Sequence, residues 1–243
     1  MAKQGSAKKK RRKSTAQTVR KRVEHGGPRF WGYPDFKGLP ASAVATALSR
    51  LVREGVLQRV GKGVYYRSAP TAFGPSGPAA SAVSAETLHA PLHPAGLSAA
   101  NVLGLTTQNP RRPEYATPAL GPPTALRDAV VHTGRSPQRA GLSAEDGAIL
   151  ETLRERASSS DLSPEKTADR LMRLLADEAR FLRLVDTAMT EPPRVRAMLG
   201  ALGQELNMPP RLLDRLRRSL NPLSRFDFGR LASLRHAREW QAK

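Results

Sequence analysis

The stretch PASAVATALSRLVREGVLQRVGKGVYYR, residues 40–67, decides the fold that we expect for the first part of this 243-residue chain. Its first half spaces Val44, Leu48 and Leu51 three or four residues apart, which makes one apolar stripe on a helix. Pro40 suits the first position of that helix, and Gly55 suits its C-terminal end. The stretch therefore predicts an amphipathic helix that begins at Pro40 and ends just before Gly55.

Two short β-type runs follow this helix, at residues 56–60 and 64–67, and Gly61-Lys62-Gly63 joins them as a tight hairpin. A helix followed by a basic hairpin is typical of the second helix and wing of a winged helix-turn-helix. We therefore expect double-stranded DNA as the partner. In the alternative interpretation, the helix and the hairpin only pack together and leave a basic face in solvent.

Polar residues of this unit are the candidate DNA contacts. Those that fall off the apolar stripe of the helix are expected in the major groove: Ser42, Thr46, Ser49 and Arg50. Those expected to contact phosphates, which position a protein without reading sequence, are Arg53, Arg59, Lys62 and Arg67. For Arg50, a guanine edge and a phosphate are both open as partners.

Charge is concentrated in the same part of the chain. The chain has 40 basic and 21 acidic residues, a net charge of +19, and residues 1–70 contribute 17 of the basic residues and 3 of the acidic ones. This excess fits a partner whose binding releases counterions. An acidic protein or a membrane surface would attract the same charge. No run approaches the roughly 18 apolar residues of a membrane-spanning helix.

The N-terminal residues divide into an arm and a helix. Residues 1–13 end in six consecutive cations, and their composition predicts a disordered basic arm that follows phosphates or the minor groove, or only aids solubility. In a eukaryote such an arm is also typical of a nuclear localisation signal. Residues 14–25 predict a helix capped by Ser14, with Val19 and Val23 facing inward. Three aromatic residues are expected in the core rather than in stacking on bases: Phe30, Trp31 and Tyr33.

Beyond the DNA-binding unit, which we place at residues 14–70, the composition changes. Residues 71–82 are rich in Pro, Gly, Ala and Ser and predict a linker. Residues 83–243 predict a second domain, mixed α/β over 83–142 and helical over 143–243. Within the mixed segment we expect helices at 85–90 and 97–105 and strands at 113–117 and 125–133. The expected fold class is α+β, mainly α.

Sequence motifs of catalysis or cofactor binding are absent. There is no phosphate-binding loop and no nucleophile elbow. His89 and His93 have a zinc-like spacing, but nearby prolines interrupt a helix there and no further ligand completes the set. The adjacent acidic pairs Glu145-Asp146 and Asp177-Glu178 are predicted to lie on solvated helix faces. We therefore expect no enzyme activity, no metal and no cofactor.

Cysteine is absent from the chain, which excludes disulfides and thiol chemistry. This composition fits a reducing cytoplasm. No apolar signal-peptide core follows the N-terminus. The expected location is cytoplasmic, in association with the nucleoid.

Three segments resemble AbiEi-type antitoxins of bacterial type IV toxin–antitoxin systems. ALSRLVREGVLQRVGKGVYYR (47–67) resembles their N-terminal winged helix. LHPAGLSAANVLGLTTQNPRRPEYAT (92–117) is similar to their second signature, a turn and a small-residue helix before a strand. LNPLSRFDFGRL (220–231) is also similar. The resemblance covers residues 14–150 well and the last hundred more loosely, and the long basic arm departs from the family pattern.

The resemblance implies a winged helix that binds inverted repeats upstream of its own operon and represses it. It also implies that the remaining part counteracts an AbiEii-type toxin, a nucleotidyltransferase-like protein encoded beside it, without the need for a stable complex. Three alternatives stay open. They are a winged-helix transcription regulator without a toxin partner, a basic RNA- or ribosome-associated protein, and a protein-interaction module.

Overall fold

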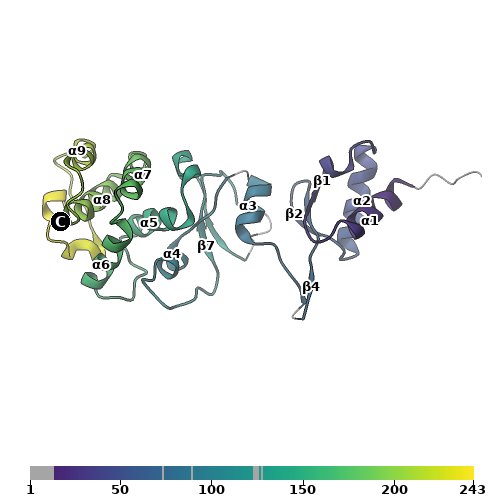
Figure 1. Ribbon diagram of the computed structural model, residues 1–243, viewed down its shortest axis with the longest axis horizontal. Helices are drawn as coiled ribbons and strands as arrows, with labels where there is room; N and C mark the ends of the chain where they lie inside the picture. Colours follow the sequence, from purple (N-terminus) through teal and green to yellow (C-terminus); the bar gives the residue numbers. More distant parts are fainter. Residues whose placement is uncertain (1–13, 73, 89, 123–125, 127) are drawn as a thin grey trace, which may run out of the picture. The chain divides into compact units, whose positions relative to one another are not determined.

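The computed structural model describes residues 14–72, 74–88, 90–122, 126 and 128–243. The chain is mixed α/β and mainly helical, as predicted, and it divides into two compact units (Figure 1). Unit 1 comprises the described residues up to Thr87, and unit 2 comprises the described residues from Leu88 onward. The basic arm that we predicted over residues 1–13 lies outside the described residues.

Unit 1 is built from helices, a three-stranded antiparallel sheet and a short two-stranded ribbon. In chain order its main elements are α1 (Thr15–His25), β1 (Phe30–Gly32), the 3-10 turn η1 (Tyr33–Phe36), α2 (Ala41–Arg53), β2 (Gln58–Gly61) and β3 (Val64–Tyr66). The strands lie in the order β1-β3-β2, so the last strand occupies the centre of the sheet. The predicted helices and hairpin are therefore present, each within about three residues of the expected bounds.

Local sequence signals explain where these helices begin and end. Ser14 caps α1 through a reciprocal pair of hydrogen bonds with Gln17, a capping box. Pro40 caps α2 from outside rather than occupying its first position, so the helix starts one residue later than predicted. After α2, Gly55 has φ +73°, the left-handed conformation that ends many helices at glycine.

A small apolar core joins α1, α2 and the sheet. Val19 and Val23 are fully buried, as predicted, against the apolar face of α2. Among the three aromatic residues, only Trp31 is buried, and it stacks on Phe36 with ring centroids 5.8 Å apart. The core prediction is wrong for the other two, because neither residue belongs to the apolar core of this unit. Phe30 is half-buried 5.2 Å from the Tyr66 ring, and Tyr33 is 44% exposed.

Residues 71–82 are not the plain linker that we predicted. β4 (Pro70–Thr71) and β5 (Gly74–Pro75) pair as a short antiparallel ribbon, and α3 (Ala80–Leu88) begins inside the range. The helix also begins five residues before the one predicted at 85–90. The reason is that alanine has the highest helix propensity, so the Ala-rich start of this segment is helical although its composition resembles a linker.

Unit 2 begins with a small sheet and continues with helices. Its first elements are β6 (His93–Pro94), α4 (Gly96–Val102), β7 (Glu114–Ala116) and β8 (Val130–His132). β7 lies between β6 and β8, antiparallel to the first and parallel to the second. The helices that follow are α5 (Ala144–Arg154), α6 (Pro164–Leu175), α7 (Glu178–Ala188), α8 (Pro193–Glu205) and α9 (Pro210–Arg218). Their apolar faces share one core with α4.

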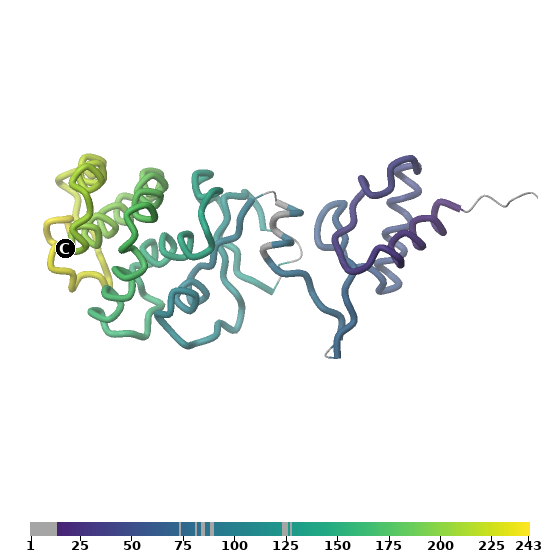
Figure 2. The backbone as a smooth tube through the Cα atoms, in the orientation of Figure 1, coloured from purple at the N-terminus to yellow at the C-terminus, as the bar shows by residue number. Residues whose placement is uncertain are grey.

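The last 25 residues are not helical throughout, which corrects the prediction for 143–243. They form the short 3-10 turns η4 (Gly229–Ser233) and η5 (Arg238–Trp240) and return to α6 and α8 (Figure 2). Trp240 is buried against Gly200, where a Cβ would overlap the indole ring. Pro222 and the left-handed Gly229 prevent a continuous helix in this segment.

Buried ion pairs hold α5 in unit 2. Asp146 is buried and pairs with Arg180 at 3.0 Å and Arg183 at 3.6 Å, so the prediction of a solvated face is wrong for this residue. Glu151 is also buried and binds Arg135 and Arg139. Burial acts to raise the pKa of Glu151, but the hydrogen bonds and charges of the two arginines outweigh it and lower the pKa below its ordinary value.

None of the helices among the described residues is long and apolar enough to cross a bilayer.

Candidate nucleic-acid interface

One face of α2 brings together five of the predicted DNA contacts. Their spacing places them on one side of the helix, and all five are exposed: Ser42, Thr46, Ser49, Arg50 and Arg53. The opposite side packs Val44, Leu48 and Leu51 into the core of unit 1. The helix is therefore anchored by its apolar side and presents hydroxyl and guanidinium groups to solvent.

Ser49 lies close to the sheet. Its hydroxyl is near the phenol of Tyr65, a buried side chain on the central strand. Burial raises the pKa of Tyr65, and the nearby Tyr33 adds to this rise, so the phenol stays neutral. The exposed face of α2 therefore lies beside β3 at this point.

The β2–β3 hairpin supplies two more exposed cations, Arg59 and Lys62. The Nε of Arg59 donates to the Gly61 carbonyl oxygen at 3.3 Å, which fixes the guanidinium beside the turn. Lys62 occupies the turn itself. Gly63 follows with φ +72° and the Tyr33 ring lies against it, so this turn position requires glycine.

Arg67 has a different environment from the other predicted phosphate contacts. It is half-buried, and its Nη1 donates to the carbonyl oxygens of Val23 at 2.9 Å and Glu24 at 2.7 Å. These carbonyls belong to the last turn of α1, where a cation also meets the negative end of the helix dipole. Since this guanidinium ties β3 to α1, we leave Arg67 out of the candidate interface.

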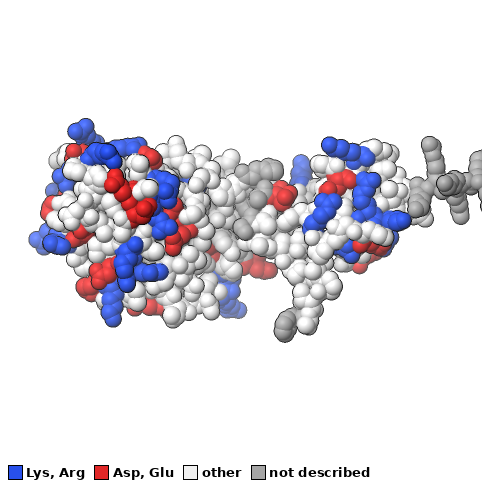
Figure 3. Space-filling view, viewed as in Figure 1, with Lys and Arg blue, Asp and Glu red and all other residues white. Residues whose placement is uncertain are grey.

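Ion pairing leaves most cations of unit 1 without a counter-charge. Residues 14–67 contain three carboxylates; Glu24 and Glu54 pair with Arg20, and Asp35 pairs with Arg29 at 2.9 Å. The other eight cations of this range form no ion pair with any described residue: Lys21, Arg22, Lys37, Arg50, Arg53, Arg59, Lys62 and Arg67. Figure 3 shows Lys and Arg side chains over α1 and α2 with some Asp and Glu side chains among them, and both signs also lie together over unit 2.

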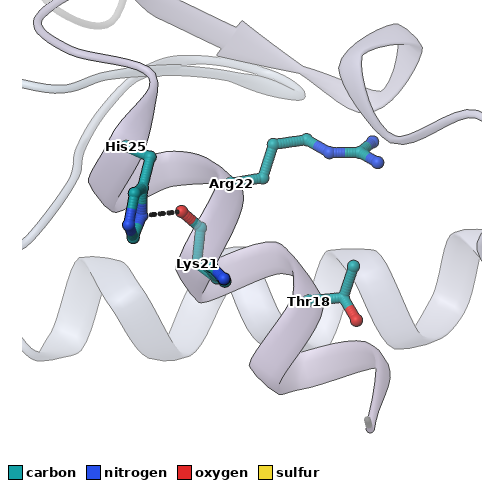
Figure 4. A pocket seen from close by; sticks show the side chains of 4 residues that line it. All are labelled: Thr18, Lys21, Arg22 and His25. Atoms are coloured by element: carbon teal, nitrogen blue, oxygen red, sulfur yellow. Dashed lines mark hydrogen bonds between the residues drawn. The ribbon is translucent and has the colours of Figure 1, made fainter. Parts of the chain in front are cut away.

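A hollow of about 360 Å³ on the surface of α1 adds a site that we did not predict. It is lined by Thr18, Lys21, Arg22 and His25 (Figure 4). The imidazole of His25 bonds the Lys21 carbonyl oxygen at 2.8 Å, and Arg22 extends in another direction to the Asp35 carbonyl oxygen at 2.8 Å. The sequence signal was present, since Thr18, Lys21 and His25 recur at helical spacing.

Unit 2 contains a second polar cluster, which sequence patterns did not reveal. Among the described residues, ligand-type atoms of Glu114, His132 and Glu155 all lie within 4.8 Å of one another. Burial raises the pKa of Glu155, and the charges of Glu151 and Glu114 add to the rise. The residues are separated by 18 and 23 positions, so no short motif marks them.

The histidine pair that we considered for zinc is arranged differently. His93 is buried and its Nε2 bonds the Arg139 carbonyl oxygen at 3.1 Å, while His89 lies outside the described residues. Burial, with a smaller contribution from the charge of Arg139, lowers the pKa of His93. This imidazole is therefore packed and neutral.

Comparisons with known proteins identify no family for the chain. No protein-family model matches it, and no curated protein matches it. A solved structure described as "Crystal structure of RV2827C protein from Mycobacterium tuberculosis" is similar, with 18% sequence identity, a TM-score of 0.46, and coverage of 86% of this chain and 82% of that one. At this identity and TM-score, the similarity supports no inference about function.

Proposed function

We propose that unit 1 is a winged-helix DNA-binding module and that the chain is a DNA-binding transcription regulator. The observation that supports this most strongly is the exposed polar face of α2 beside a basic hairpin, within residues 14–67, whose three carboxylates are already paired. The order helix, strand, helix, hairpin also supports it, as does the β1-β3-β2 order of the sheet.

In this proposal α2 enters the major groove and the hairpin lies against the backbone as a wing. Short hydroxyl side chains at Ser42, Thr46 and Ser49 approach base edges, and Arg50 reaches either a guanine or a phosphate. Arg53, Arg59 and Lys62 bind phosphates and set the register of the protein on the duplex. Because these cations form no ion pair within the protein, no internal interaction has to be broken when they bind phosphates.

The hollow on α1 is proposed as a further phosphate contact. The Lys21 ammonium is the donor that would bind phosphate oxygens, whereas the Thr18 hydroxyl already donates to the Ser14 carbonyl oxygen and the His25 Nδ1 to that of Lys21. A duplex that contacts both α1 and the wing would be held at two places besides the groove.

Charge variants on α2 test the DNA-binding proposal. We expect Arg50→Ala/Arg53→Ala to weaken binding of duplex DNA by at least about tenfold and to lower the salt slope of log K by about two units, because two cation contacts are lost. The matched control is Arg173→Ala/Arg218→Ala, which removes two exposed cations from helices of unit 2. Equal losses in both variants, measured by fluorescence anisotropy, would contradict a DNA interface on α2.

We further propose that the regulator represses its own operon and acts as the antitoxin of a type IV toxin–antitoxin system. This part rests on the resemblance of residues 47–67, 92–117 and 220–231 to AbiEi-type antitoxins. In that role it counteracts a nucleotidyltransferase-like toxin, and no stable complex between the two is assumed.

Co-expression tests the antitoxin role. If a nucleotidyltransferase-like gene lies beside this one, its induction alone should arrest growth, and this chain expressed in trans should restore it. A toxic neighbour that this chain leaves fully toxic would contradict the antitoxin role, and the DNA-binding proposal would then stand as a regulator without a toxin partner.

A further inference from the structure

The sheet and the first long helix of unit 2 bring three ligand-type side chains together. Ala116 on β7 is the register partner of His132 on the parallel strand β8. Glu114 lies two residues before Ala116 and therefore on the same face of the sheet, diagonal to His132. Glu155 follows the last residue of α5 and completes the cluster. The three residues come from three separate elements, each with packed neighbours in unit 2.

The spacing of these side chains fits a single small cation. Nε2 of His132 lies 3.5 Å from Oε2 of Glu114. A tetrahedral ion with bonds of about 2.1 Å holds its ligand atoms about 3.4 Å apart, so this pair already spans one edge of such a site. The third ligand atom lies within 4.8 Å of both, a gap that rotation of the Glu155 side chain can close.

The carboxylates of the cluster lack a Lys or Arg partner among the described residues. Among the described residues, no Lys or Arg side chain forms an ion pair with Glu114 or Glu155, and the nearby Arg135 donates to Glu151 at 2.8 Å and 3.0 Å. Nε2 of His132 is buried and has no hydrogen-bond partner in the described structure. Two carboxylates and an unsatisfied ring nitrogen at this spacing favour a bound positive charge.

The backbone beside the cluster leaves space for the Glu114 carboxylate. Gly96 has φ +51°, and a Cβ at this position would overlap the Glu114 carboxylate, so glycine leaves room for it. In addition, the C-terminal end of α5 points its partial negative charge toward Glu155, which favours a cation there.

We propose that Glu114, His132 and Glu155 bind one divalent transition-metal ion, with water in the remaining coordination positions. One imidazole and two carboxylates suit Zn²⁺ or a similar borderline ion, whereas Mg²⁺ and Ca²⁺ prefer sets made of oxygen alone. The proposal concerns unit 2 and is independent of DNA binding by unit 1.

Titration of the full chain, without a histidine tag and treated with chelator, tests this site. We expect one equivalent of Zn²⁺ to bind in calorimetry and to raise the melting temperature. Co²⁺ should give the visible absorption of a low-symmetry site with nitrogen and oxygen ligands. Mg²⁺ at the same concentration should produce neither effect. Absence of saturable Zn²⁺ binding would overturn the proposal.

Variants with matched controls locate the ion. Glu114→Gln, His132→Asn and Glu155→Gln should each weaken Zn²⁺ binding at least about tenfold, because each replaces a strong ligand by a neutral amide, and the two Gln variants also keep the side-chain size. Glu165→Gln, on the exposed first turn of α6, and His236→Asn, outside the cluster, should leave binding unchanged. Circular dichroism of each variant checks folding. Binding that survives all three ligand variants, or that is lost in His236→Asn alone, would overturn the assignment.

Discussion

Arg20 and Arg29 determine which cations of unit 1 are available to a polyanion. By pairing with all three carboxylates of residues 14–67, they leave the α2 and hairpin cations unneutralised. A surface that pairs its own charges gains little from a phosphate backbone, since each new contact replaces an old one. The proposed interface depends on this internal separation of paired and unpaired residues.

Single substitutions should separate sequence-reading contacts from positioning contacts. Lys62→Ala should weaken binding to all duplexes equally and lower the salt slope by about one unit, because in the proposed interface Lys62 contacts only phosphate. Arg50→Ala should cost about 1–3 kcal/mol on the preferred site alone if Arg50 binds a guanine edge. Anisotropy on matched and mismatched duplexes measures both. A Lys62→Ala protein with altered sequence preference and an unchanged salt slope would contradict these roles.

His93 makes stability depend on pH. Its pKa is lowered by burial from the ordinary value of 6.5, so below that pH the unfolded chain binds a proton that the folded chain does not. This histidine should therefore reduce the stability of unit 2 as the pH falls from about 6.5 toward the pKa of the folded state. Above about pH 6.5 it should have no effect on stability. Histidine NMR resonances measured across this range check the claim. A titration midpoint of His93 at or above 6.5 would contradict it.

At the scale of elements, the junction between α2 and the hairpin depends on one glycine. Gly55 has φ +73° and open space around it, so Gly55→Ala should destabilise unit 1 through backbone strain alone, by about 1–2 kcal/mol. Gly77→Ala is the matched control, because Gly77 also has open space but no positive φ. Urea unfolding compares the two variants, and equal stability would show that the turn tolerates a side chain.

Elements with strong local signals were predictable from the sequence. The capping residue Ser14, the apolar stripe of α2 and the glycines around Lys62 each act within a few residues, and the structure has α1, α2 and the hairpin where they were predicted. The helix starts at Pro164 and Pro210 were predictable for the same reason. Short-range physical chemistry is sufficient for these.

Features that depend on distant packing were not predictable. Asp146 is buried because two arginines of α7 reach it, and the final residues fold back because Trp240 fits over Gly200. The adjacency of Glu145 and Asp146 along a helix suggested solvent for the first, and helical periodicity suggested a helix for the second. The Glu114 cluster likewise depends on the register of two strands that are joined through a long connection.

At the scale of the whole molecule, two compact units predict two separable responses. DNA should raise amide protection within residues 14–67, and Zn²⁺ should raise it around residues 93–155, because a ligand stabilises the unit that binds it. Hydrogen-exchange mass spectrometry of the intact chain measures both. Protection by DNA confined to unit 2, or by Zn²⁺ confined to unit 1, would contradict the assignment of the two sites.

The most direct test of the central claim is fluorescence anisotropy of the intact protein on the DNA upstream of its own gene, against a scrambled duplex, at two salt concentrations. The proposed regulator predicts a preference of roughly 10³-fold or more for the upstream DNA, which persists at the higher salt. Equal and steeply salt-dependent binding to both duplexes would contradict it, because only non-specific attraction to phosphate would be present.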